Sequence, residues 1–185
     1  GTNLPSHCDR LKTPGIDMTT GSLGQGSSTA AGIALAHKMN GKPNTIYLML
    51  GDGEINEGQV WEMALFAGTK KLSNLIAFVD YNKLQLDGPT KEICDVGDVA
   101  KKFEDFGWYA QDIDGHDVAA IHAAIENAKA QREKPSMIVL NTEKAHGWSA
   151  MANKTGSHSA NITAELLEDA LNEMNAALKS IEEGK

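Results

Sequence analysis

A chain of 185 residues with 41% hydrophobic content is long enough for one domain with its own core, and two independent domains are not expected. Its 25 acidic and 17 basic residues give a net charge of −8 that is spread along the chain, which disfavours nucleic-acid binding and favours a soluble protein. Cys8 and Cys94 lie far apart with no metal-site spacing, so neither a disulfide framework nor a zinc site is indicated, and a reducing, cytoplasmic setting is the default. The longest apolar run, Ile46 to Leu50, is too short to cross a bilayer, so no membrane partner is expected.

The expected elements alternate between helices and strands. The chain opens on a loop-like stretch, Gly1 to Gly15, which has no initial Met and suggests a fragment. Helical periodicity and short apolar runs then follow in turn: helices at 27–39, 59–71 and 118–132, strands at 45–50, 74–80 and 136–141, an irregular loop at 154–162 and a final helix from Thr163, which is a candidate N-cap. Because the strands are apolar on both faces, the sequence predicts an α/β fold, a parallel sheet with helices on both faces.

One strand end carries the strongest chemical signal. Gly51-Asp52-Gly53 ends the first apolar run, and Asn82 follows the second. A diphosphate needs a hard cation to offset its charge, and such a cation takes oxygen ligands of the kind that Asp52 and Asn82 offer. The two glycines let the backbone approach a phosphate, and a helix N-terminus after them would supply free N–H groups. The plainer interpretation, an ordinary turn and an ordinary loop residue, is weaker because the two features occur together.

A second glycine-rich segment precedes the first helix. Gly21-Ser-Leu-Gly-Gln-Gly26 fits neither a dinucleotide fingerprint nor a P-loop, because Ser27 stands where a P-loop requires Lys. Taken by itself, it could simply be the entry to a helix.

Three stretches of the sequence resemble the transketolase family, above all the thiamine-diphosphate-binding N-terminal subunit of its split bacterial members. They are Gly51-Asp-Gly-Glu-Ile-Asn-Glu-Gly-Gln-Val-Trp-Glu62, Lys71-Leu-Ser-Asn-Leu-Ile-Ala77 and Asp80-Tyr-Asn-Lys-Leu-Gln-Leu-Asp-Gly88. The whole chain, 1–185, would then be the diphosphate-binding domain, without its N-terminal segment and without the separate pyrimidine-binding domain.

The resemblance implies a cofactor site with named residues. Thiamine diphosphate would be held through Mg²⁺, or Ca²⁺ or Mn²⁺ in its place, with Asp52, Asn82 and the backbone carbonyl of Leu84 as metal ligands. The cofactor-binding set would be Gly21, Ser22, Leu23, Gly51, Gly53, Glu54, Asn82 and His158, with the Gly53 amide meeting the diphosphate.

Two of the six histidines acquire a catalytic expectation from the resemblance. His7 resembles the histidine of a Gly-His-Pro segment near the donor sugar, although Ser6 and Cys8 flank it here. His158 resembles a histidine that faces the diphosphate, and an alternative alignment places Asn161 there instead. His37, His116, His122 and His146 receive no catalytic role.

Two acidic residues, Glu57 and Glu62, fit two interpretations equally. They could lie at an interface and couple two active sites, as the resemblance implies, or simply form a solvated helix start.

The resemblance implies two-carbon ketol transfer from a ketose phosphate to an aldose phosphate. The glutamate that activates the cofactor belongs to a second polypeptide in this family. The expected partner is therefore a transketolase C-terminal, pyrimidine-binding subunit, in a dimer or heterotetramer. Three alternatives remain open: a 1-deoxy-D-xylulose-5-phosphate synthase-like enzyme, a dehydrogenase-type thiamine enzyme, and a thiamine-diphosphate-binding module without turnover.

Overall fold

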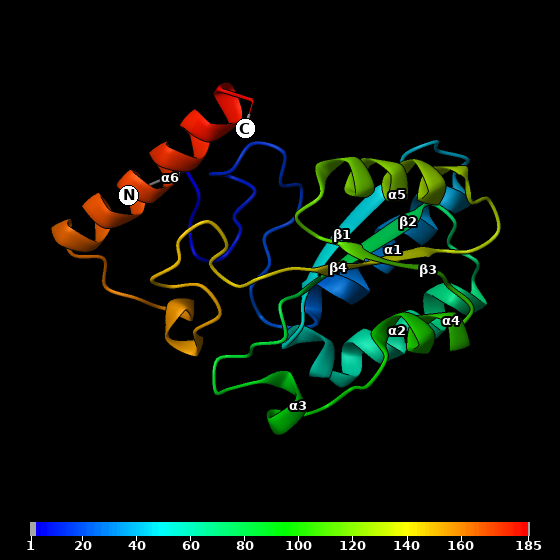
Figure 1. Ribbon diagram of the computed structural model, residues 1–185. Coiled ribbons are helices and arrows are strands. Elements are labelled where there is room, and N and C mark those ends of the chain that lie inside the picture. Colours follow the sequence, from blue (N-terminus) through cyan, green and yellow to red (C-terminus); the bar gives the residue numbers. More distant parts are fainter. Residues whose placement is uncertain (1–2, 185) are drawn as a thin grey trace.

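The chain folds around a four-stranded parallel sheet with the strand order β1-β2-β4-β3 (Figure 1). The computed structural model describes residues 3–184. The strands are β1 (Ile46–Gly51), β2 (Leu75–Tyr81), β3 (Tyr109–Asp114) and β4 (Ser136–Asn141). The helices are α1 (Gln25–Met39), α2 (Gly58–Thr69), α3 (Thr90–Ile93), α4 (Val99–Asp105), α5 (Val118–Ala130) and α6 (Ala164–Glu182), with short 3-10 turns η1 (Glu54–Asn56) and η2 (Thr155–His158). The predicted α/β fold with a parallel sheet is confirmed.

Helices cover the two faces of the sheet unequally. The larger core cluster joins α1, α2 and α4 to one face, through residues such as Leu50, Val79 and Phe103. The smaller cluster joins α5 to the other face, through Ile76 and Ile138 among others. β1 is apolar on both faces, as predicted, but on the α5 side it is not covered by a helix: Tyr47 and Met49 remain 52% and 62% exposed. β1 is an edge strand, and α5 packs on its neighbours instead.

The elements that sequence patterns did not reveal are β3, α4, the one-turn helix α3 and the two 3-10 turns. β3 is the other edge strand, and its polar side chains, Gln111 and Asp112, break up the apolar run that identifies a buried strand. α4 has only seven residues, and it begins where the Asp98 carboxylate accepts the N–H of Lys101 at 2.8 Å.

The last helix, α6, lies to one side of the sheet (Figure 1), and hydrogen bonds join it to the loop after β4. Thr163 is its N-cap, as the sequence predicts, because its hydroxyl oxygen accepts the N–H of Leu166 at 3.3 Å. The Asp169 carboxylate accepts the indole N–H of Trp148, and the Glu173 carboxylate accepts the N–H of Ser149. Between residues 3 and 184 there is no helix long and apolar enough to span a membrane.

The absence of a side chain at Gly68 lets α2 pack closely against the turn before β3. A methyl group built on Gly68 would lie 1.9 Å from the carbonyl oxygen of Phe106, which is backbone and cannot rotate away. The neighbouring Trp108 is buried, and its indole N–H donates to the carbonyl of Ala64 in the same helix at 2.8 Å. α2 therefore touches this turn backbone to backbone.

Gly68→Ala is expected to destabilise the chain by about 1–3 kcal/mol, the usual cost of overpacking, in urea unfolding monitored by circular dichroism. The matched control is Gly32→Ala in α1, where a methyl group meets nothing within 4 Å. There the gain in helix propensity should stabilise the fold by up to about 1 kcal/mol. Equal effects of the two substitutions would contradict the close packing of α2.

Candidate cofactor site at the carboxyl edge of the sheet

The carboxyl ends of all four strands meet along one edge of the sheet. The parallel register pairs Gly51 of β1 with Asp80 of β2, and it pairs Asn141 of β4 with both Tyr81 of β2 and Asp114 of β3. Ligands of open α/β sheets bind at this edge, where the loops after the strands converge. The residues that the sequence singles out after β1 and β2 are therefore neighbours in space.

Asp52 and Asn82 converge on one backbone amide. The N–H of Leu84 donates to Asp52 Oδ2 and to Asn82 Oδ1, each at 3.1 Å. Between them in sequence, Lys83 adopts a left-handed backbone conformation with φ of 68°, which is costly for a residue that has a side chain. This strained turn brings an amide oxygen of one loop beside the carboxylate of another.

Within the described part of the chain, the carboxylate of Asp52 is buried without a cationic partner. The residue is 5% exposed, and its oxygens accept N–H groups from Gly53 and Leu84. Burial raises the pKa of Asp52 above its ordinary value of 3.8, the backbone hydrogen bonds lower it, and the charge of Asp80 raises it further. Among the ion pairs formed within residues 3–184, none joins Asp52 to Lys or Arg.

This donor set suits a hard divalent cation. A buried carboxylate next to a neutral amide oxygen offers the oxygen ligands that such a cation prefers, and the cation would supply the positive charge that Asp52 lacks. The described residues contain no group of three or more His, Cys, Asp and Glu side chains placed to hold a metal. A metal here would thus depend on Asp52, Asn82 and a backbone carbonyl such as that of Leu84, completed by ligands from outside the chain.

Glu54 ties the two glycine-rich loops together. Its Oε1 accepts the N–H of Gly24 at 3.0 Å, and its Oε2 accepts the N–H of Gly51 at 3.2 Å. The first amide belongs to the Gly21–Gly26 segment at the start of α1, and the second lies at the end of β1. The sequence predicts Glu54 among the cofactor-binding residues, and the structure shows its carboxylate bonded to the backbone of both loops.

Two features describe the turn around Gly53. The N–H of Gly53, which the resemblance assigns to a diphosphate, donates here to Asp52 Oδ1 at 2.7 Å. A long helix does not begin directly after the glycine turn, because the 3-10 turn η1 intervenes and α2 begins only at Gly58. Within this turn, Glu54 is hydrogen-bonded to the end of β1, where its Oε2 accepts the N–H of Gly51.

His7 and the Gly21 loop line a shared cavity of about 510 Å³. Gly21 and Ser22 lie on its wall with Thr20 and Gln25, while Leu23 is 54% exposed and outside the lining. A methyl group on Gly21 would lie 2.1 Å from Cδ2 of His7, so the imidazole packs directly on the loop backbone. The structure thus places His7, Gly21 and Ser22 at one cavity, whereas sequence patterns propose them as site residues on separate grounds.

A second cavity, of about 640 Å³, opens between the loops that follow β2, β3 and β4. Its lining includes Asp80 in β2 and Asn82 directly after it, His116 after β3, and Thr142 and Lys144 after β4. Sequence patterns did not single out Lys144, and they gave His116 no role. The sequence signal that could have identified His116 and Lys144 as cavity residues is their position just beyond the carboxyl ends of β3 and β4.

His158 lies next to this second cavity and not in its lining. It is exposed at the end of η2, and its Nδ1 lies 3.1 Å from Nζ of Lys144. Asn161 is also exposed. The structure therefore brings one of the two alternatives, His158, beside a lysine that borders the cavity.

Comparisons with known proteins identify the family of the chain. The family model described as "Transketolase, thiamine diphosphate binding domain" matches residues 1–178. The chain is 53% identical to the 6-deoxy-6-sulfo-D-fructose transketolase subunit of Clostridium sp. strain MSTE9, and the alignment covers 94% of this chain and 63% of the relative. It is 38% identical to an apulose-4-phosphate transketolase subunit of Actinobacillus succinogenes, over 94% of this chain and 62% of the relative.

A solved structure supports the same relationship. A crystal structure of Pichia stipitis transketolase with sedoheptulose-7-phosphate superposes with a TM-score of 0.85 at 34% identity, covering 95% of this chain and 27% of that one. The chain thus spans less than two thirds of the length of these relatives. Since the family model extends over nearly the whole sequence, the chain belongs to the transketolase family, as its thiamine-diphosphate-binding domain.

Proposed function

We propose that the chain is the cofactor-holding subunit of a two-chain transketolase. Thiamine diphosphate would bind through Mg²⁺, or Ca²⁺ or Mn²⁺, on Asp52, Asn82 and the Leu84 carbonyl. The observation that carries this proposal is the buried Asp52 carboxylate, which has an amide oxygen beside it and no ion pair with Lys or Arg among the described residues to balance it.

The other residues at the sheet edge are proposed to bind and orient. The backbone of Gly51 and Gly53 would lie along the diphosphate, and Lys144 with His158 would add positive charge or N–H donors on its other side. The contact between these two side chains is why we prefer His158 to Asn161. His7, Gly21, Ser22 and Leu23 would border the cofactor's ring and the sugar, where an imidazole can exchange a proton near neutral pH.

The proposed reaction moves a two-carbon ketol unit from a ketose donor to an aldose acceptor. The cofactor, when bound, supplies the carbon that carries this unit, and the protein supplies the binding geometry and the electrostatic environment. Ketose phosphates are the first candidate donors. The 53% identity to a relative named for 6-deoxy-6-sulfo-D-fructose makes a ketose with a terminal sulfonate the second, since both classes end in an anionic group.

A partner polypeptide is part of the proposal. Two of the most similar relatives are named as subunits, and this chain matches only about a quarter of single-chain transketolases. We propose that the partner is a pyrimidine-binding C-terminal subunit, in a heterodimer or a heterotetramer.

The test is a titration followed by an assay. Isothermal calorimetry should show thiamine diphosphate binding to the chain with Mg²⁺ and little binding with excess EDTA or with unphosphorylated thiamine. The chain with a transketolase C-terminal subunit is then assayed with fructose 6-phosphate, xylulose 5-phosphate and 6-deoxy-6-sulfofructose as donors. Metal-independent binding would refute the metal assignment, and binding without turnover in any mixture would favour a non-catalytic binding module.

A further inference from the structure

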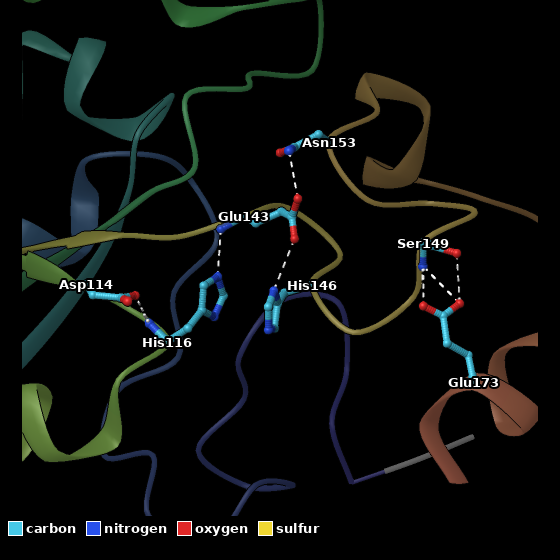
Figure 2. A network of polar contacts seen from close by, with 7 residues as sticks. All are labelled: Asp114, His116, Glu143, His146, Ser149, Asn153 and Glu173. Carbon is cyan, nitrogen blue, oxygen red and sulfur yellow. Dashed lines mark hydrogen bonds and ion pairs between the residues drawn. The ribbon is translucent and has the colours of Figure 1, made fainter. Parts of the chain in front are cut away.

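The turn after β3 is closely packed against the end of β4. The N–H of Gly115 donates to the carbonyl of Asn141 at 2.8 Å, and a methyl group on Gly115 would lie 2.5 Å from Cγ2 of Thr142. Asp114 Oδ1 accepts the N–H of His116 at 2.8 Å, which fixes the backbone of the turn (Figure 2). The imidazole of His116 is thereby held over the loop that follows β4.

That imidazole makes two contacts with the loop of residues 142–146, which we call the β4 loop. His116 Nε2 accepts the N–H of Glu143 at 2.7 Å, so this nitrogen carries no proton (Figure 2). The ring also stacks on that of His146, with centroids 3.8 Å apart and planes inclined by 19°. The Glu143 carboxylate, in turn, contacts His146 Nδ1 at 3.1 Å and accepts from Asn153 Nδ2 at 2.8 Å.

The β4 loop has a conformation that needs such support. Ala145 adopts a left-handed backbone with φ of 56°, which costs a residue with a side chain on the order of 1–2 kcal/mol. Lys144 lies between the residue that His116 holds and this strained position, and it lines the same cavity as Asn82. The direction of the Lys144 side chain therefore depends on where the Glu143 amide is fixed.

We propose that His116 is a positioning residue: by accepting the Glu143 amide it fixes the β4 loop and holds Lys144 at the second cavity, which Asn82 also lines. The inference rests on the proposed function for the identity of the ligand, whereas the fixing of the loop rests only on the contacts between His116 and the β4 loop. Without the acceptor, the Glu143 amide loses its partner and the strained loop relaxes.

Two substitutions of His116 separate the contribution of its hydrogen-bond acceptor from that of its aromatic ring. His116→Gln keeps an acceptor near the place of Nε2 and loses the stack on His146. His116→Phe keeps an aromatic ring and loses the acceptor. The control is His122→Phe, on the exposed side of α5.

Amide hydrogen exchange, measured by NMR on the ligand-free chain, tests the fixing of the loop. His116→Phe should speed exchange of the Glu143 amide by about tenfold, the size expected for one net hydrogen bond. His116→Gln and His122→Phe should leave it within about twofold of the parent. Unchanged protection in the Phe variant, or equal loss in the Gln variant, would overturn the assignment to the acceptor.

Calorimetry with thiamine diphosphate and Mg²⁺ tests the link to the site. The Phe variant should bind about tenfold more weakly, and the Gln variant should bind nearly as tightly as the parent, a rescue that a purely structural role of the ring would not produce. Equal affinity of the Phe variant and the parent overturns the link to the cofactor. If the parent itself binds no cofactor, the proposed function fails with the link, and the exchange measurement alone decides whether His116 fixes the loop.

Discussion

Replacing Asp52 by Asn is expected to weaken Mg²⁺-dependent binding of thiamine diphosphate by more than about 100-fold. Loss of a residue that only orients a metal ligand typically weakens metal binding by about 10–100-fold, and loss of a ligand itself should weaken it further. The reason is that the other proposed protein ligands, Asn82 and the Leu84 carbonyl, are neutral oxygens. Only Asp52 supplies a negative charge to the cation from within this set. Calorimetry at fixed Mg²⁺ measures the effect.

The same substitution should change how the ligand-free chain responds to pH. Burial raises the pKa of Asp52 above 3.8. At a pH between 3.8 and the raised pKa, Asp52 is therefore protonated in the folded chain and ionised in the unfolded chain. The parent therefore loses stability as pH rises from about 3.8 through the raised pKa, and the penalty is complete once pH lies above that raised pKa. The Asn variant has no such proton and should lose less stability over that range in urea unfolding.

The matched control for both measurements is Asp105→Asn at the exposed end of α4, which removes only an ion pair with Lys101. It should leave cofactor affinity unchanged and cost no more than about 0.5 kcal/mol. Parent-like cofactor affinity in Asp52→Asn would remove Asp52 from the metal site. Parallel pH profiles of parent and variant would show that its burial is not costly.

Replacing Glu54 by Ala should destabilise the chain by about 2–4 kcal/mol, since two backbone N–H groups, of Gly24 and Gly51, lose their acceptor together. Glu54→Gln retains one acceptor oxygen and should lose about half as much. Cofactor affinity should fall by about tenfold in the Ala variant, because the Gly21 loop and the Gly51 turn are no longer held to each other. Urea unfolding and calorimetry measure the two effects.

Glu92→Gln, on the exposed surface of α3, serves as the control and should change neither quantity. Loss of affinity in the Ala variant without loss of stability would mean that Glu54 contacts the cofactor directly and does not act through the two loops. Loss of stability with full affinity would mean that the loops keep their places without it.

Much of the architecture follows from the sequence because its signals are local. The apolar run of β4 was predicted at its observed bounds, and those of β1 and β2 were predicted within one residue, since buried parallel strands are continuous apolar segments. The cap of α6 was likewise predicted, because Thr163 satisfies a donor only three residues away. β3 was missed because an edge strand needs no apolar run, and the exposed outer face of β1 was missed because its residues, Tyr47 and Met49, are apolar all the same.

For the site, too, some contacts could be predicted from the sequence and others could not. The pairing of Asp52 with Asn82 could be predicted from sequence, because each follows an apolar strand and parallel strands end at one edge. The joining of Gly24 to Gly51 through Glu54 could not, since Glu54 is 30 residues from Gly24 and nothing local marks the contact.

Sequence by itself determined the family and the fold class, and it predicted the residues that we propose for a diphosphate and its metal, because these depend on motifs that are contiguous or fixed to strand ends. Tertiary structure alone decided that Asp52 is buried without an ion pair to Lys or Arg in the described part of the chain, that Lys144 borders the cavity of Asn82, and that His116 accepts the amide of the β4 loop. Charge balance and loop support are sums over neighbours from separate segments, and only the folded chain determines which segments become neighbours.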